Sequence, residues 1–250
     1  MSAITIKTEE EIEGLRASCA ITAELLRLIE GWIVPGVTTI EIDRRAEDFI
    51  RSRGAVPAFK GLYGFPGTVC SSVNEEVVHG IPGDRMLCEG DIVSIDTGAL
   101  YRGMYSDAAR TYLVGQVDAK VEKLVKETEA SFDAGIKLVK EGVHLGDVSH
   151  AIQCHAEKFG FGVVKEYVGH GVGRKPHEPP DIPNYGKKGT GPILKAGMTL
   201  AIEPMINMGR ADVEWLDDDW TVVAEDGLPS AHYENTILIT DGEPEILTLL

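Results

Sequence analysis

The chain has 250 residues, of which 24 are Lys or Arg and 40 are Asp or Glu, so its formal net charge is -16. Negative charge of this size repels phosphate backbones and anionic lipid headgroups, so we expect neither nucleic-acid nor membrane binding. No apolar run approaches the roughly 20 residues of a membrane span, and the N-terminus lacks the basic and apolar regions of a secretory signal. These features predict a cytoplasmic globular protein.

The cysteines are widely spaced and include no C-x-x-C pair, which argues against a zinc ribbon and a thioredoxin-type motif. We interpret all four as small buried hydrophobes in a reducing compartment. Cys70 is the best candidate for a catalytic thiol, the minor alternative, because His79 lies near it. The four are Cys19, Cys70, Cys88 and Cys154.

Two capping boxes predict the first two helices. Thr8 with Glu11 begins a stretch in which apolar residues recur at helical spacing up to the "PG" at 35 and 36. Thr38 with Glu41 begins a second amphipathic stretch that ends near Gly54. The N-terminal region is therefore expected to be a pair of helices.

The second half of the sequence repeats the first. A helical stretch from about 121 to 139 precedes "EGVHLGDVSHAIQCHA", which aligns with "PGVTTIEIDRRAEDFI" at a shift of 106 residues, and Gly160 is the expected helix stop. "LCEGDIVSID" aligns with "LKAGMTLAIE" at a shift of 107. So long a period predicts two related halves, about 1–115 and 120–250, in a single domain spanning 1–250.

Each aligned strand ends on an acid, Asp96 in the first half and Glu203 in the second. Burying an unpaired carboxylate is so unfavourable that such groups are nearly always paired, protonated or bound to a metal. If the chain reverses at Tyr101 and Arg102, Asp96 faces Asp107 across an antiparallel pair, where like charges destabilise the sheet. A divalent cation between the two carboxylates would offset their repulsion. The alternative is a slipped register, in which one aspartate is exposed and the other buried.

Histidines and a further acid extend this set. "EYVGHGVGRKPHEPP" carries His170 and His177 among glycines and prolines, "VVHGIPG" places His79 at a strand end, and "AHYENTILIT" supplies Glu234 before an apolar strand. Each histidine alone is more often a hydrogen-bonded structural residue than a ligand. His232 shares a strand face with Glu234, but it could equally be exposed and is given no role. Carboxylates with one or two imidazoles favour Mn, Fe, Co, Ni or Zn.

Taken together, Asp96, Asp107, His170, Glu203 and Glu234 have the order and spacing of metallo-aminopeptidases with the pita-bread fold. Five sequence segments resemble those of type I methionine aminopeptidases: "SVNEEVVHGIP", "GDIVSIDTGA", "GHGVGRKPHEPP", "AIEPM" and "HYENT". The resemblance covers nearly the whole chain. It implies an α+β fold in which two halves of antiparallel sheet, related by a pseudo-twofold axis, are covered by helices and form one catalytic domain.

The resemblance also implies roles for the five ligands of a pair of divalent metal ions. Asp96 would chelate one ion and His170 the other, while Asp107 and Glu234 would bridge the two. Glu203 would bind the second ion and transfer protons. The metal used in the cell, among Co, Mn, Fe, Ni and Zn, is not specified by such a ligand set.

The remaining expectations concern the substrate. By resemblance, His79 and His177 contact the scissile peptide and help to stabilise the tetrahedral intermediate, and an apolar pocket receives the methionine side chain. The implied reaction removes the initiator methionine from nascent chains with a small second residue, by a monomer in transient contact with the ribosome. The expected pocket residues are Phe59, Leu62, Phe65, Cys70 and Trp220.

The sequence departs from the resemblance at one position and is compatible with two rival functions. Pro176 stands where relatives often carry an aromatic residue that closes the methionine pocket, and Phe59 could fill some of that volume. A proline-specific peptidase would use the same ligands, but such relatives usually carry an additional N-terminal domain. A non-enzymatic binding protein is expected to have lost ligands, whereas all five are present here.

Overall fold

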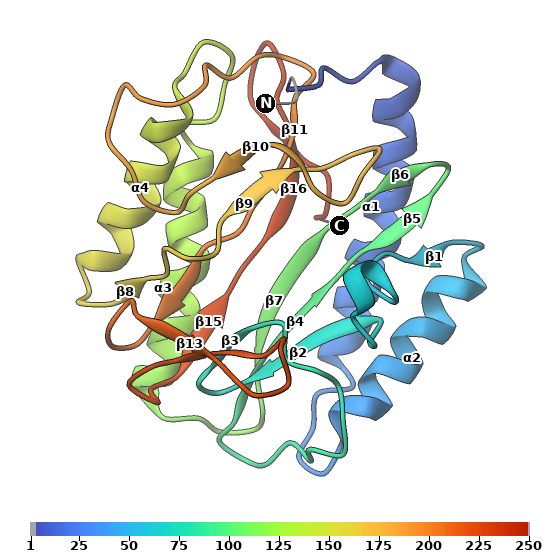
Figure 1. Ribbon diagram of the computed structural model, residues 1–250, viewed down its shortest axis with the longest axis vertical. Helices are drawn as coiled ribbons and strands as arrows, with labels where there is room; N and C mark the ends of the chain where they lie inside the picture. Colours follow the sequence, from blue (N-terminus) through green and yellow to red (C-terminus); the bar gives the residue numbers. More distant parts are fainter. Residues whose placement is uncertain (1–3, 250) are drawn as a thin grey trace.

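The computed structural model describes residues 4–249 and confirms the α+β prediction. Its helices are α1 (Glu9–Glu30), α2 (Thr39–Ser52), α3 (Ala119–Ile136) and α4 (Leu145–Glu157), with a short 3-10 turn at Leu62–Gly64. In Figure 1, α1 and α2 lie on one side of the strands and α3 and α4 on the other. None of the helices in the described part combines the length and apolar character that a bilayer crossing requires.

The strands are short and all pair antiparallel. Those before α3 are β1 (Val56–Pro57), β2 (Val69–Val73), β3 (Glu76–Val78), β4 (Ile92–Thr97), β5 (Ala99–Tyr101), β6 (Met104–Tyr105) and β7 (Ala108–Leu113). Those after α4 are β8 (Gly162–Val163), β9 (Gly169–Gly171), β10 (Glu178–Ile182), β11 (Thr199–Ile202), β12 (Met205–Asn207), β13 (Val213–Trp215), β14 (Val222–Ala224), β15 (Ser230–His232), β16 (Asn235–Leu238) and β17 (Glu245–Ile246).

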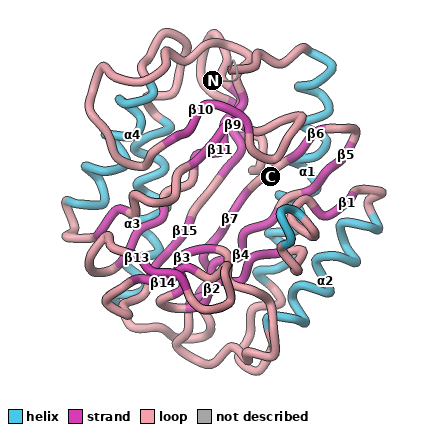
Figure 2. Tube along the Cα trace, in the orientation of Figure 1, coloured by secondary structure: helices cyan, strands magenta, loops and turns pink. Residues whose placement is uncertain are grey.

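Figure 2 shows the strands across the middle of the view, with α3 and α4 at one side and α1 and α2 at the other. Two of the sheets are β2-β4-β7 in the first half and β10-β9-β11-β16-β17 in the second. A third sheet, β13-β14-β3, joins strands of both halves. The prediction of antiparallel sheets covered by helices is therefore confirmed.

The capping boxes act as predicted. The Thr8 backbone N–H donates to Glu11 Oε2 at 2.8 Å, and the Thr38 backbone N–H donates to Glu41 Oε2 at 3.0 Å. These bonds fix where α1 and α2 begin, because they satisfy groups near the helix start that have no partner within the helix. After the C-terminus of α4, Gly160 adopts φ 80° and stops the helix as expected.

The duplication extends to single contacts. Thr38 forms a β-bridge with Met86, and His144, which follows it by 106 residues, forms one with Ile193. The Gly36 N–H donates to the Leu87 carbonyl at 2.8 Å, as the Gly142 N–H does to the Leu194 carbonyl at 2.9 Å. Matched apolar positions are buried in both halves: Ile42 and Val148, Ala46 and Ile152, Val93 and Leu200, Ile95 and Ile202.

The predicted register of the carboxylate hairpin is wrong by two residues. Arg102 and Gly103 both have positive φ, 51° and 76°, and they form the turn. A two-residue turn of this kind suits the twist of the flanking strands. Asp96 consequently pairs with Ala109 and not with Asp107. Because side chains alternate with period two, the shift keeps both aspartates on one face of the sheet.

The two halves are joined where β7 runs beside residues 232–236, a contact that we call the seam. The Glu234 N–H donates to the Ala109 carbonyl at 3.0 Å, and the Asp107 N–H donates to Thr236 Oγ1 at 3.1 Å. Thr236 Oγ1 also donates to the Asp107 carbonyl at 2.8 Å. Asp107 and Glu234 are therefore both held at the seam.

The interpretation of all four cysteines as buried is wrong for two of them. Cys19 and Cys70 are buried, whereas Cys88 and Cys154 are exposed. Cys154 lies on α4, where its Sγ is 3.3 Å from His150 Nε2. Cys154 is not on the buried face of α4, which carries Val148, Ile152 and Ala156.

Candidate active site

All twelve residues that the sequence marked as candidates line one cavity of about 320 Å³. The carboxylates and His170 form one part of its wall, and the aromatic residues form another. The candidates come from segments as far apart as Phe59 and Glu234, so the cavity gathers both halves of the chain. They are Phe59, Leu62, Phe65, Cys70, His79, Asp96, Asp107, His170, His177, Glu203, Trp220 and Glu234.

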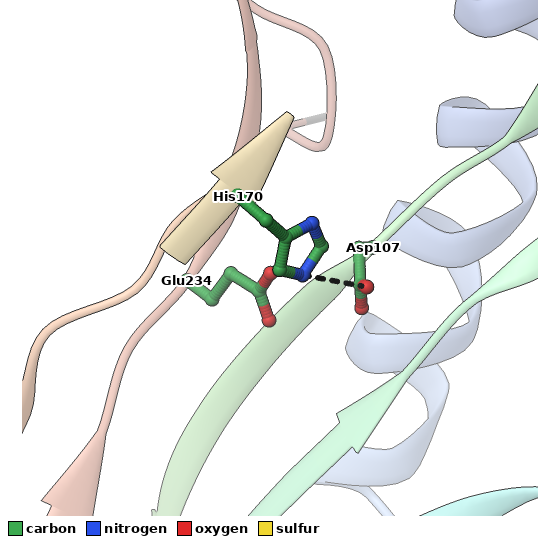
Figure 3. Close-up of side chains that lie close together, drawn as sticks. All are labelled: Asp107, His170 and Glu234. Atoms are coloured by element: carbon green, nitrogen blue, oxygen red, sulfur yellow. Dashed lines mark ion pairs between the residues drawn. The ribbon is translucent and has the colours of Figure 1, made fainter. Parts of the chain in front are cut away.

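Three of these side chains, from three different segments of the chain, point toward one another (Figure 3). One ligand atom each from Asp107, His170 and Glu234 lie within 4.8 Å of one another, which is close enough to share a metal ion. His170 Nε2 is 3.7 Å from Asp107 Oδ2 and 3.5 Å from Glu203 Oε1. Asp107 and Glu234 are almost fully buried, with 4% and 1% of their surfaces exposed.

The carboxylates lack protein partners for part of their oxygens. Asp96 Oδ1, Asp107 Oδ1 and Glu234 Oε1 are buried and have no hydrogen-bond partner among the described residues. Such orphaned oxygens are rare in native proteins, and each requires an explanation. A divalent cation fits this donor set, since hard and borderline cations bind carboxylate oxygen and imidazole nitrogen.

Burial also raises the pKa of every one of these acids. It brings Asp96 to a pKa of about 7, and the pKa values of Asp107, Glu203 and Glu234 lie well above their ordinary range. Loss of hydration is the first cause, and for Asp107 and Glu234 the neighbouring carboxylates add to it. A cation would reverse this effect by favouring the charged forms.

The local backbone orients His170 for a ligand role. Its Nδ1 is 2.9 Å from the Gly171 carbonyl oxygen, so Nδ1 carries the proton and Nε2 presents a lone pair to the acids. Burial lowers the pKa of His170 to about 4, which keeps the ring neutral near pH 7. A hydrogen bond of this kind on the far nitrogen is what fixes metal-binding imidazoles.

The other two predicted histidines stand beside this acid cluster. His79 directly follows β3 and has a positive φ of 62°, a strained backbone that turns its ring into the cavity. Burial lowers the pKa of His79 to about 4. His177 lies at the cavity mouth just before β10, with its ring centroid 4.4 Å from that of His170. Both residues line the cavity.

The apolar wall contains the five pocket residues expected from the sequence. Phe65 and Trp220 pack edge to face with centroids 5.1 Å apart, and Phe59 is 8% exposed. Burial raises the pKa of the Cys70 thiol well above its ordinary value, so Cys70 is a neutral wall residue and not a nucleophile. Pro176 is not among the residues that line the cavity.

Tyr63 and His232 are among the residues at the site that were given no role from the sequence. Tyr63 has a positive φ of 51° and stacks on His177 with centroids 5.9 Å apart, which places an aromatic ring beside the residue that follows Pro176. His232 is 1% exposed, and its Nε2 lies 3.5 Å from Glu203 Oε2 without a hydrogen-bond partner in the described chain. The sequence signal for His232 is that it lies two residues before Glu234, a spacing that places both side chains on one face of a strand.

Comparisons with known proteins agree with this geometry. A family model described as metallopeptidase family M24 matches residues 13–241. The chain is 53% identical over 247 residues to a methionine aminopeptidase of Clostridium perfringens, covering 99% of both chains. It is 49% identical over 245 residues to methionine aminopeptidase 1 of Bacillus subtilis, covering 98% of this chain and 99% of the relative.

Solved structures place the fold in the same group. A methionine aminopeptidase from Thermotoga maritima superposes with a TM-score of 0.98 at 48% identity, covering 99% of this chain and 100% of the other. A prolidase from Pyrococcus furiosus superposes with a TM-score of 0.78 at 26% identity; the match covers 98% of this chain but 65% of the prolidase. The chain belongs to metallopeptidase family M24, on its methionine aminopeptidase branch.

Proposed function

We propose that the protein uses two divalent metal ions to remove the initiator methionine from nascent chains whose second residue is small. One observation carries the proposal: partnerless carboxylate oxygens and His170 Nε2 face the same cavity as an aromatic wall. Its membership of the methionine aminopeptidase branch supports the substrate. We further propose that it acts in the cytoplasm as a monomer in transient contact with the ribosome.

The donor set fits two adjacent ions. Asp96 would chelate one ion, His170 and Glu203 the other, and Asp107 and Glu234, which meet at the seam, would bridge them. Bound divalent ions would supply Lewis acidity, which lowers the pKa of a nearby water and polarises the substrate carbonyl. The apolar wall would bind the methionine side chain and exclude water from it.

The chain's own residues would then act on the substrate. Glu203 would accept a proton from the attacking water and pass it to the leaving amine, a transfer that requires hydrogen-bond reach of both atoms. His177 would donate a hydrogen bond to the carbonyl oxygen as negative charge develops on it. His79, neutral near pH 7 because burial lowers its pKa to about 4, would hold the scissile peptide.

Peptide hydrolysis tests the proposal. Enzyme purified without added cobalt is assayed on Met-Ala-Ser and on an X-Pro peptide, with its metal content measured in parallel. We expect Met-Ala-Ser to be cleaved faster, and chelation to abolish cleavage. Faster cleavage of the X-Pro peptide would favour the prolidase-like function, and hydrolysis by metal-free protein would contradict the mechanism.

A further inference from the structure

The N-terminal segment before α1 reaches the loop that carries His177, through a pair of buried charges. Lys7 Nζ donates to Glu178 Oε2 at 2.8 Å, and the two side chains are 1% and 6% exposed. Thr5 Oγ1 donates to the same oxygen at 2.7 Å and accepts from Lys7 Nζ at 2.6 Å. Glu178 directly follows His177 in the sequence.

Hydrogen bonds that involve main-chain groups fix both partners of this pair. The Lys7 N–H donates to the Gly197 carbonyl at 2.8 Å, which ties the segment to the second half of the chain. Glu178 Oε1 accepts from the Lys175 N–H at 3.1 Å, which closes the loop on itself. A methyl group added at Gly173 would lie only 2.2 Å from Lys7 Cε, so the loop and the lysine are packed without spare space.

The imidazole of His177 has no such support of its own. No hydrogen bond within residues 4–249 holds its ring, which is exposed at the cavity mouth and touches the rings of Tyr63 and His170. Its position therefore depends on the backbone, and the nearest fixed side chain along the chain is Glu178. A buried ion pair is weak support for stability, because apolar residues of similar volume often serve as well. We therefore take placement of the His177 loop as the main effect of the Lys7–Glu178 pair.

We propose that the Lys7–Glu178 pair is a positioning device that sets His177 against the substrate carbonyl. The inference rests on the proposed role of His177 in the reaction. Misplacement of a reacting group by about 1 Å can reduce a rate roughly 100-fold. Loss of the pair should therefore lower kcat by about tenfold or more while KM changes little, because the methionine pocket lies on other segments.

The test compares two variants with the wild type. Lys7→Met leaves Glu178 buried without its cation, so the double variant Lys7→Met/Glu178→Leu is included, which removes both charges and should fold as stably as the wild type. We expect kcat on Met-Ala-Ser to fall in both, with bound metal unchanged. Arg174→Gln, which removes an exposed ion pair of the same loop with Glu11, is the matched control and should keep wild-type kcat.

A double-mutant cycle with His177→Ala separates positioning from a general structural effect. If the pair acts through His177, the charge-free variant Lys7→Met/Glu178→Leu should lower kcat by less than about twofold when it is introduced into His177→Ala. An equal loss in both backgrounds would overturn the proposal, as would wild-type kcat in the charge-free variant.

The imidazole signal of His177 in NMR spectra gives a readout that does not depend on activity. We expect this signal to shift or broaden in Lys7→Met/Glu178→Leu and to stay unchanged in Arg174→Gln. An unchanged signal in the charge-free variant would overturn the inference. A shifted signal in a protein that never cleaves Met-Ala-Ser would support the tether and contradict the proposed function.

Discussion

Replacing Asp96 with asparagine should stabilise the metal-free protein while it removes activity. Burial raises the pKa of Asp96 from an ordinary 3.8 to about 7 in the folded chain. At about 1.4 kcal/mol per pH unit, that difference corresponds to up to about 4 kcal/mol. For a chain of this length, it predicts a rise in Tm of roughly 8–16 °C.

The sign of the effect sets its pH dependence. A carboxyl with a raised folded-state pKa gives its full stability below the unfolded pKa, and this contribution is lost as pH rises through the folded pKa. The metal-free wild type should therefore lose stability between about pH 4 and pH 8 on account of Asp96. Asp96→Asn lacks this loss, so its advantage should be largest at pH 8 and should shrink at pH 5.

Thermal unfolding in EDTA at pH 5 and pH 8 measures this difference. Asp48→Asn, an exposed acid on α2, is the matched control and should change stability by less than about 0.5 kcal/mol. With Mn²⁺ at about 100 times its Kd, the wild type should gain about 2.7 kcal/mol and the variant less. An Asp96→Asn protein that is no more stable than the wild type at pH 8 in EDTA would refute the reasoning.

Three further predictions concern the same cavity. Asp107→Asn should abolish turnover and lower metal occupancy measured by mass spectrometry, because it removes charge from between two cations; wild-type turnover would exclude a bridging role. His177→Ala should lower kcat by about 10²-fold or more while metal content persists, and loss of metal would instead identify it as a ligand. His232→Ala should weaken Mn²⁺ binding in calorimetry by roughly 10-fold, since it removes the imidazole whose Nε2 lies 3.5 Å from Glu203 Oε2; unchanged affinity would show that His232 only fills space.

Much of the fold could be read from the sequence because its signals are local. The Thr8 and Thr38 capping boxes, the stop at Gly160 and the apolar periodicity each depend on neighbouring residues, and α1, α2 and α4 follow them. The internal repeat added long-range information, since it paired Asp96 with Glu203 across the chain. These signals identified the candidates that line the cavity.

The failures have a common physical cause, which is that tertiary contacts decide what local patterns leave open. The turn at Arg102 and Gly103 moved the hairpin register by two residues, although the alternation of side chains was correct. His232 lies on a three-residue strand that is buried on both faces, so alternation could not tell whether it was exposed. Tyr63 stacks on His177 from a backbone with positive φ, which is uncommon for a tyrosine and is not indicated by local sequence patterns.

The seam between the halves limits how this protein can move. Asp107 and Glu234 sit on neighbouring backbones that are bonded to each other, so a rotation of one half against the other would change the spacing of both acids at once. A hinge motion that opens and closes the two halves would therefore disrupt the candidate metal site. Peptides would therefore reach the cavity without a rotation of one half against the other, while the centre stays stiff.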